Sequence, residues 1–266
     1  MLVLLLLASL AHAEDPTFVT PADAGQKYEE PETHLSAELG GAMASGNTVY
    51  YTVNGLLNAS HRFKRNQLAA SAAVNLGRGV LDADGDGILS EAERAAPRVE
   101  IARKYQGEAR YDRFVGSKGS LYVLGGALSD IYAGYDLRAH EQVGYSRILL
   151  DREDTKLKAE LGADVAEEDY IAGVDPGFAM IYAARAMVSF THDFNGSVGF
   201  SDKVEVYENV IDPADLRLLN EAALSAKLSD VLSVKLSNQL TFDNVPVTGF
   251  RKLDQITLVS LVATLL

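Results

Sequence analysis

The chain has 266 residues, of which 47% are hydrophobic and 23% charged, with a formal net charge of −13 and no cysteine. This composition excludes a disordered chain. The strong negative charge leaves no electrostatic footprint for nucleic acid, and there is no basic cluster for anionic lipid. The absence of cysteine excludes disulfides, thiolate zinc sites and cysteine nucleophiles.

The first residues have the pattern of a secretory signal peptide. Leu2 to Leu10 is an almost unbroken apolar run, and Ala11-His12-Ala13 supplies a small-x-small cleavage pattern. No Lys or Arg precedes the run, so a buried N-terminal strand or helix is the alternative. The run is too short to cross a bilayer as a helix, and no later segment reaches about 18 apolar residues. We predict export, with residues 1–13 as the signal peptide, cleaved near Ala13.

Residues 14–33 are polar and contain Pro16, Pro21 and Pro31, which predicts a flexible periplasmic leader. From His34 onward, apolar residues recur at every second position. A spacing of two is typical of a β-strand with one apolar and one polar face. We therefore predict that residues 34–266 form a single all-β domain.

The strands are long and their connections alternate in length. Most run ten residues or more, where soluble sheets favour about five or six and a tilted membrane-spanning strand needs about nine to eleven. Short turns alternating with longer loops, including 79–98, are typical of outer-membrane barrels. The sequence predicts an antiparallel transmembrane β-barrel of about twelve strands, near 34–44, 48–62, 67–78, 99–113, 119–129, 135–148, 155–167, 179–192, 197–208, 215–228, 231–243 and 252–265.

Alternation alone does not say which face is inside, and a soluble periplasmic carrier with an apolar interior is an alternative. Twelve strands enclose more space than apolar side chains would fill, which favours a polar lumen. In this register Glu141, Asp202 and Asn220 fall on the outer face, where a charge costs up to about 2–4 kcal/mol at the membrane midplane. Either they lie near an interface or a β-bulge shifts the register. The polar face carries ionisable residues of both signs, which predicts ion pairs across the lumen: Glu38, Lys104, Glu108, Arg110, Arg138, Lys156, Lys158, Glu160, Arg185, Lys203, Glu205, Arg217, Glu221, Lys227 and Lys235.

The segment from Ala37 to Asn47, with its Ser45-Gly46-Asn47-Thr48 turn, resembles the DUF481 family, also known as the salt-induced outer membrane protein family. The regions 105–111, 137–145, 157–170 and 253–266 resemble the same family, so the resemblance covers roughly 34–266. It implies an outer-membrane barrel, in contact with outer-membrane lipid and the barrel assembly machinery, and implies no known activity. The chain departs from the usual barrel pattern by ending in Leu265-Leu266 instead of an aromatic residue, and by an insertion in its second external loop.

That insertion, from Asp82 to Glu93, matches the calcium-binding loop of an EF-hand. Calcium takes about six to eight oxygen ligands, and Gly87 permits the sharp turn that the loop needs. Downstream, Ser90 to Ala96 can form about two helical turns, but no full entering helix and no second EF-hand are present. We predict one weak structural Ca²⁺ site, and the alternative is a solvated acidic loop. The predicted ligands are the carboxylates of Asp82, Asp84 and Asp86, the carbonyl of Ile88, Ser90 directly or through water, and both oxygens of Glu93.

The sequence contains few other motifs that would indicate a catalytic or ligand-binding site. The histidines show no metal-binding spacing, and the chain has neither a phosphate-binding glycine loop nor a Gly-x-Ser-x-Gly elbow. His34-Leu35-Ser36 is similar to the His-x-Ser of outer-membrane phospholipases but lacks an obvious Asn partner. We predict no catalytic residue and no enzyme activity. The leading hypothesis is a passive pore for small solutes or ions, or an envelope-structural protein, with a calcium-binding external loop. The alternatives are a calcium-dependent surface binding module anchored by the barrel, and an outer-membrane hydrolase.

Overall fold

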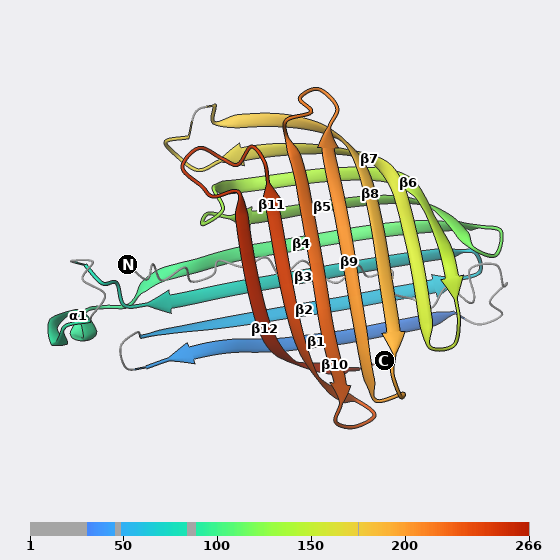
Figure 1. Ribbon diagram of the computed structural model, residues 1–266, viewed down its shortest axis with the longest axis horizontal. Helices are drawn as coiled ribbons and strands as arrows, with labels where there is room; N and C mark the ends of the chain where they lie inside the picture. The colour runs from blue at the N-terminus through green and yellow to red at the C-terminus, as the bar shows by residue number, and fades with distance from the viewer. Residues whose placement is uncertain (1–30, 46–48, 84–88, 175, 266) are drawn as a thin grey trace.

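The computed structural model describes residues 31–45, 49–83, 89–174 and 176–265. The predicted signal peptide, nearly all of the leader and the Gly46-Asn47-Thr48 part of the first turn lie outside the described residues. The described chain forms a closed barrel in which every strand pairs antiparallel with its neighbours in sequence, and β1 pairs with β12 to close the ring (Figure 1). Among the described residues, no helix has the length and apolar character needed to cross a membrane.

The observed strands agree with the predicted ones to within a few residues. The first strand, β1, begins at Glu32, two residues before its predicted start. The bounds are β1 Glu32–Ala44, β2 Tyr50–Phe63, β3 Asn66–Gly79, β4 Val99–Val115, β5 Gly119–Asp130, β6 Tyr135–Asp151, β7 Thr155–Tyr170, β8 Phe178–Asp193, β9 Val198–Asn209, β10 Leu216–Lys227, β11 Leu232–Asp243 and β12 Leu253–Thr264.

The barrel has two unlike ends. At the end that we call the turn end, β2–β3, β4–β5, β6–β7, β8–β9 and β10–β11 are joined by short turns. At the opposite end, the loop end, the connections include 80–98, 171–177, 210–215 and 244–252. The β5–β6 connection, Ile131–Gly134, is as tight as a turn, so the alternation in length is less regular than predicted.

The inserted loop between β3 and β4 contains α1, Glu91–Ala95. Ser90 caps this helix: its side chain accepts the Glu93 backbone N–H while the Glu93 side chain accepts the Ser90 backbone N–H. The helix is shorter than the predicted two turns. It ends where Ala96 adopts an extended conformation, as expected for a residue that precedes a proline.

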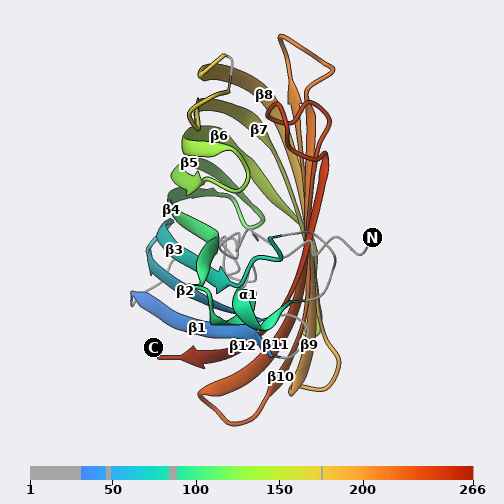
Figure 2. The ribbon, with the colours of Figure 1, turned by 90° about the vertical axis from the view of Figure 1, so that its left-hand side faces the viewer.

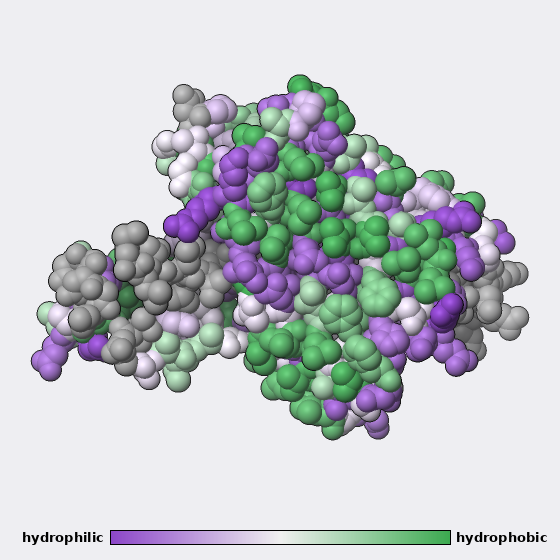
Figure 3. Space-filling model, viewed as in Figure 1, coloured by the Kyte–Doolittle hydropathy of each residue, from purple (hydrophilic) through white to green (hydrophobic). Residues whose placement is uncertain are grey.

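The barrel is apolar outside and polar inside, which reverses the arrangement of a soluble protein. Leu39 and Leu161 on the outer face are 66% and 69% exposed, whereas the inner residues Glu160 and Asp130 are 1% and 0% exposed. Figure 3 shows large apolar areas over the outer face of β9–β12. The face assignment made from the alternation is therefore confirmed. Along the paired strands, residues at every second position lie on the same face of the barrel.

Three outward polar residues stay outward in the structure. Register shifts occur next to Gly77, Leu128, Tyr135 and Ile148, and none of them moves Glu141 to the lumen. On the other side of the barrel, the Asn220 amide donates a hydrogen bond of 2.6 Å to Asp202. Polar residues cross that outer face between two apolar areas in Figure 3. This mutual hydrogen bond lowers the desolvation cost of placing both groups on an apolar surface.

The ring is not uniform around its circumference. Figure 2 shows β9–β12 as a nearly straight wall opposite the curved β1–β8. The closing seam is also shorter than the other ladders, because β1 pairs with β12 only from Ser36 to Gly40, five residue pairs, while every other neighbouring pair of strands shares at least eleven.

Candidate functional site in the barrel lumen

The ionisable residues predicted for the polar face do line the lumen. Glu108, Arg138, Lys156 and Lys158 are partly exposed, and Lys227 lies exposed at the turn-end rim. The buried members of the predicted set are Glu38, Lys104, Arg110, Glu160, Arg185, Lys203, Glu205, Arg217, Glu221 and Lys235. Ion pairs link them, as expected for charges removed from water.

The centre of the lumen holds an arginine network built around Glu160 of β7. Arg110 of β4 donates to both Glu160 oxygens, at 2.8 and 3.1 Å, and also pairs with Asp112 at 2.8 Å. Arg185 of β8 donates to Glu160 at 2.8 Å, and Lys158 lies 3.3 Å away. Three cations therefore share one fully buried carboxylate, and Arg185 continues the network to Glu205 of β9 at 2.8 Å. We call this set the central cluster.

Tyr122 of β5 forms the base of the central cluster. The Arg110 guanidinium lies 4.0 Å from the Tyr122 ring centroid, and Arg185 donates to the Tyr122 hydroxyl at 2.8 Å. The aromatic ring of Tyr122 packs against the inner face of the barrel because the neighbouring strands β6 and β7 carry Gly144 and Gly162. A Cβ at either position would stand 2.6 or 2.8 Å from the Tyr122 hydroxyl oxygen. Sequence reasoning missed Tyr122, although inward glycines opposite an inward aromatic residue are a recognisable signal.

A second network lies nearer the loop end, around Glu168 of β7. Arg217 of β10 donates to Glu168, and the Arg138 guanidinium of β6 lies 3.2 Å from it. The Tyr170 hydroxyl donates to the same carboxylate at 2.7 Å. Glu168 is 0% exposed, yet it was absent from the predicted set. It lies within the run Glu167-Glu168-Asp169, where only the register shows which carboxylate faces inward.

Aromatic residues near strand ends commonly form rings at the two interfaces of a membrane barrel. Two such residues of this chain, Tyr170 and Tyr207, face the lumen instead. Tyr170 donates to Glu168, and the Tyr207 hydroxyl donates to Glu205 at 2.8 Å. Both rings thus serve the inner hydrogen-bond networks, because a hydroxyl on a rigid ring reaches a carboxylate that a short side chain could not reach.

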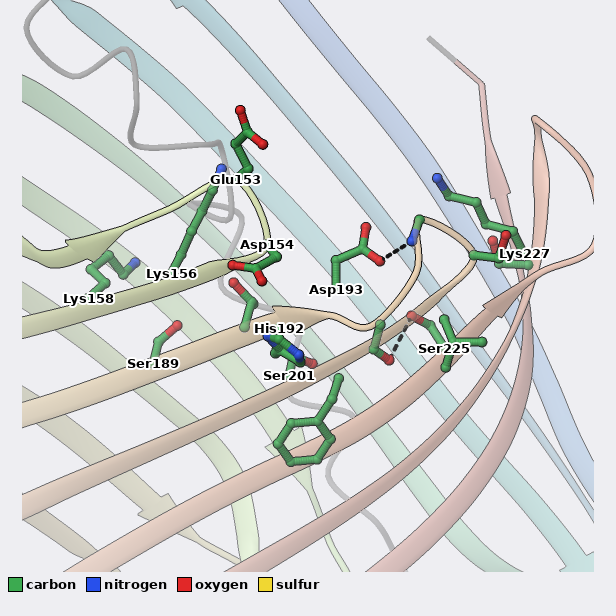
Figure 4. A pocket seen from close by; sticks show the side chains of 17 residues that line it. Glu153, Asp154, Lys156, Lys158, Ser189, His192, Asp193, Ser201, Ser225 and Lys227 are labelled. Atoms are coloured by element: carbon green, nitrogen blue, oxygen red, sulfur yellow. Dashed lines mark hydrogen bonds between the residues drawn. The ribbon is translucent and has the colours of Figure 1, made fainter.

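At the turn end, the lumen opens into a cavity of about 440 Å³, which we call the turn-end vestibule (Figure 4). Further inside, next to the central cluster, the free space falls to about 60 Å³, lined in part by Arg138, His140 and Tyr207. The cavity at the turn end is thus much larger than the one beside the central cluster. The vestibule lining includes Glu153, Asp154, Lys156, Lys158, Ser189, Thr191, Asp193, Ser201, Ser225, Lys227 and Ser233.

The structure describes three of the six predicted calcium ligands, Asp82, Ser90 and Glu93, while Asp84, Asp86 and Ile88 lie outside the described residues. One Glu93 oxygen accepts the Ala83 N–H at 2.7 Å, and the other accepts the Ser90 N–H and hydroxyl, each at 2.8 Å. The last carboxylate of the loop therefore reaches back to its first residues. Within the described part of the chain, no three His, Asp or Glu side chains gather as a metal site.

The family model described as "Protein of unknown function, DUF481" matches residues 37–265. The chain belongs to the DUF481 family. This result confirms the resemblance seen in the sequence. No match was found among curated proteins.

Solved structures show what this DUF481 protein is similar to in fold. The NanC porin aligns with 14% identity over 87% of this chain and 100% of its own, with a TM-score of 0.51. An outer-membrane channel from Pseudomonas putida F1 aligns with 11% identity over 88% of this chain and 95% of its own, with a TM-score of 0.47. The KdgM porin in complex with disordered oligogalacturonate aligns with 9% identity over 88% of this chain and 100% of its own, with a TM-score of 0.44. At such identities, the NanC similarity shows a shared barrel fold.

Proposed function

We propose that this DUF481 protein spans the bacterial outer membrane and provides a narrow, charge-lined pathway for small ions and solutes. The single observation that carries the proposal is the reversed polarity of the barrel, with aliphatic side chains outside and paired charges inside. Lipid tails stabilise the aliphatic outer face, and water in the lumen stabilises the charged inner face. Outer-membrane lipid and the barrel assembly machinery are then its expected partners.

The orientation follows from the connections. Outer-membrane barrels have short turns in the periplasm and longer loops outside. The turn end would then face the periplasm, and the loop end, with α1, the exterior. The central cluster restricts the pathway, so we expect a small conductance. If the ion pairs seal the lumen completely, the same barrel has an envelope-structural role.

Single-channel recording of the mature chain in a planar bilayer tests the pathway. Steady ohmic steps are expected. Arg138→Gln should shift the selectivity toward cations, because Arg138 lines the small cavity inside the lumen beside the central cluster. Arg147→Gln, the same change on the outward face of the same strand, should leave the selectivity unchanged. Silence from protein shown to be folded and inserted would overturn the pore and leave the structural role.

We also propose that the loop from Asp82 to Glu93 binds one Ca²⁺ weakly, with a dissociation constant of about 10⁻⁴ to 10⁻³ M, as in extracellular modules. The support is local: Glu93 reaches back to Ala83, and Leu89, at the position where an EF-hand loop packs an apolar side chain, is only 7% exposed. Calcium should protect this loop from protease. Glu93→Ala should abolish the protection, and Glu91→Ala, in the same helix but outside the ligand pattern, should keep it. Equal protection in both variants contradicts the site.

One observation favours a second candidate function, a calcium-dependent surface binding module anchored by the barrel. Figure 1 shows α1 projecting beyond the loop ends of β2 and β3. A calcium-ordered segment that projects beyond the strands in this way is placed to contact an external partner. A calcium-independent conductance together with calcium-dependent loop protection would favour this role for the loop.

A further inference from the structure

We propose that the outer face of β9–β12 docks against a second copy of this chain, forming a two-fold dimer in the membrane that is held by amide side chains. The inference goes beyond the proposed function. It rests on the barrel lying in a membrane and does not depend on an open lumen. It starts from polar side chains on a face that would otherwise meet only lipid tails.

The polar side chains of this face form one continuous stripe across four strands, which we call the amide stripe. Figure 3 shows polar residues crossing this face between two apolar areas. Each member is next in sequence to a buried lumen residue, so each points outward. The amide stripe consists of Asp202 of β9, Asn220 of β10, Asn238 of β11, and Gln255 and Thr257 of β12.

Hydrogen bonds within the barrel satisfy the amide stripe only in part. The Asn220 amide donates to Asp202 at 2.6 Å and to the Lys203 carbonyl at 3.1 Å. Within the described part of the chain, no group donates to the Asn220 side-chain oxygen. An amide oxygen left without a donor in lipid is costly, because the hydrocarbon offers it no hydrogen bond.

The β11–β12 half of the amide stripe carries the complementary groups. Asn238 donates to the Thr257 hydroxyl at 2.9 Å and to the Ile256 carbonyl at 3.1 Å, and accepts one Gln255 N–H at 3.3 Å. The second Gln255 N–H has no acceptor among the described residues. This half therefore has a donor to offer, while Asn220 has an acceptor.

Asn220 and Asn238 lie at nearly the same depth in the membrane. Counted from the loop end, Asn220 is the fifth residue of β10 and Asn238 the sixth of β11, and each strand has twelve residues. Asn220 pairs with Leu240, so Asn238 is two residues nearer the turn end in the ladder. Because barrel strands are tilted, this diagonal offset brings the two amides to a common depth near the middle of the strands.

A second copy can satisfy both amides at once. Two barrels in one membrane must have their turn ends on the same side, so a two-fold axis between them runs along the membrane normal and preserves depth. With the axis between β10 and β11, Asn220 faces Asn238 of the partner subunit, and the same pair occurs twice. Asparagine both donates and accepts, so each pair is self-complementary.

The surroundings of the two asparagines suit close packing of two walls. Figure 2 shows β9–β12 as a nearly straight wall, which a second copy can meet along several strands. Ala222, directly opposite Asn238 in the β10–β11 ladder, is small and lets the two walls approach. Outward leucines flank the amides on both sides and would pack in the same contact: Leu218, Leu224, Leu236 and Leu240.

Disulfide crosslinking tests the pairing directly, because the chain has no cysteine of its own. Full chains carrying Asn220→Cys and Asn238→Cys are mixed, refolded together into lipid vesicles and oxidised. A covalent dimer of the two variants should form. The mixed dimer keeps one asparagine pair intact, so the substitutions do not remove the whole contact.

The matched control mixes Val143→Cys with Leu161→Cys. These residues face outward on β6 and β7 with the same diagonal offset, since Val143 pairs with Ala163. They lie on the curved wall opposite β9–β12 and should give no covalent dimer above the level of random collision. Equal crosslinking of the two mixtures would overturn the docking face.

A second measurement removes the amides without removing the fold. Subunit counting by single-molecule photobleaching, over a series of lipid dilutions, should show wild-type dimers. Asn220→Leu combined with Asn238→Leu should weaken dimerisation about tenfold, because both amide pairs are lost while leucine suits the lipid-facing surface. Glu141→Leu, which removes an outward polar side chain from β6, should dimerise like wild type.

Two results would overturn the dimer: wild-type protein that is monomeric at every dilution, with lipid alone covering the face, or equal dimerisation of wild type and the double leucine variant. Neither measurement needs an open pathway. A dimer that never conducts contradicts the pore alone, and a conducting monomer contradicts the dimer alone.

Discussion

The central cluster and the turn-end vestibule are built on the same strands and enclosed by the same wall, yet they hold charge in opposite ways. In the central cluster, Arg110 and Arg185 share Glu160, and Tyr122 packs beneath them. In the vestibule, lysines stand among hydroxyl groups around free space. A planar guanidinium can bind two carboxylates at once and stack on a ring, whereas an ammonium is a point charge on a flexible stem. Arginine therefore joins several strands across the centre of this lumen, whereas the vestibule lysines leave free space between the strands.

The largest effect expected from this contrast is at Glu160. Glu160→Gln leaves Arg110, Arg185 and Lys158 around a neutral side chain, and breaking a buried ion pair on one side typically costs about 3–5 kcal/mol. The free energy of unfolding, measured by urea titration in lipid vesicles with circular dichroism, should fall by an amount of that order. Glu167→Gln, on the exposed outer face of the same strand, should change it by less than about 0.5 kcal/mol. Similar values for the two variants would show that the central cluster does not hold the wall together.

A smaller effect is expected where Tyr122 rests on the wall. Gly144→Ala places a Cβ 2.6 Å from both the Tyr122 hydroxyl oxygen and the Leu161 carbonyl oxygen. Such overpacking typically costs about 1–3 kcal/mol. Gly125→Ala, on the adjacent strand, meets its nearest atom only at 3.9 Å, so the same titration should barely distinguish it from wild type. If Gly144→Ala is tolerated as well as Gly125→Ala, Tyr122 is not fixed against the wall.

The smallest effect should come from the vestibule. Lys156→Gln combined with Lys227→Gln should leave the free energy of unfolding within about 0.5 kcal/mol of wild type, as is usual for exposed side chains. A large loss of stability would instead mean that these lysines belong to the structural network and that the contrast between the two regions is wrong.

Most of the fold could be predicted from the sequence because successive residues of a barrel strand point to opposite faces, one apolar and one polar. The alternation from Leu157 to Val165 was enough to place Lys158 and Glu160 in the lumen. Which lumen residues meet could not be predicted, because Arg110 and Glu160 belong to strands separated by two others and contact each other only through the curvature of the wall. The role of Tyr207 could not be predicted either, because its position near a strand end says nothing about whether its hydroxyl reaches Glu205.

The short seam between β1 and β12 has a consequence for the order in which the strands pair during assembly. It joins the two ends of the barrel sequence, so its closure carries the highest loop-closure entropy, and it returns the fewest backbone hydrogen bonds. On the loop-end side of Gly40, no β1–β12 pair is present among the described residues, although both strands continue. This ladder should form last during assembly. Once the ring is complete, the amides of β1 and β12 that face this seam should exchange with solvent deuterium before those of any other ladder.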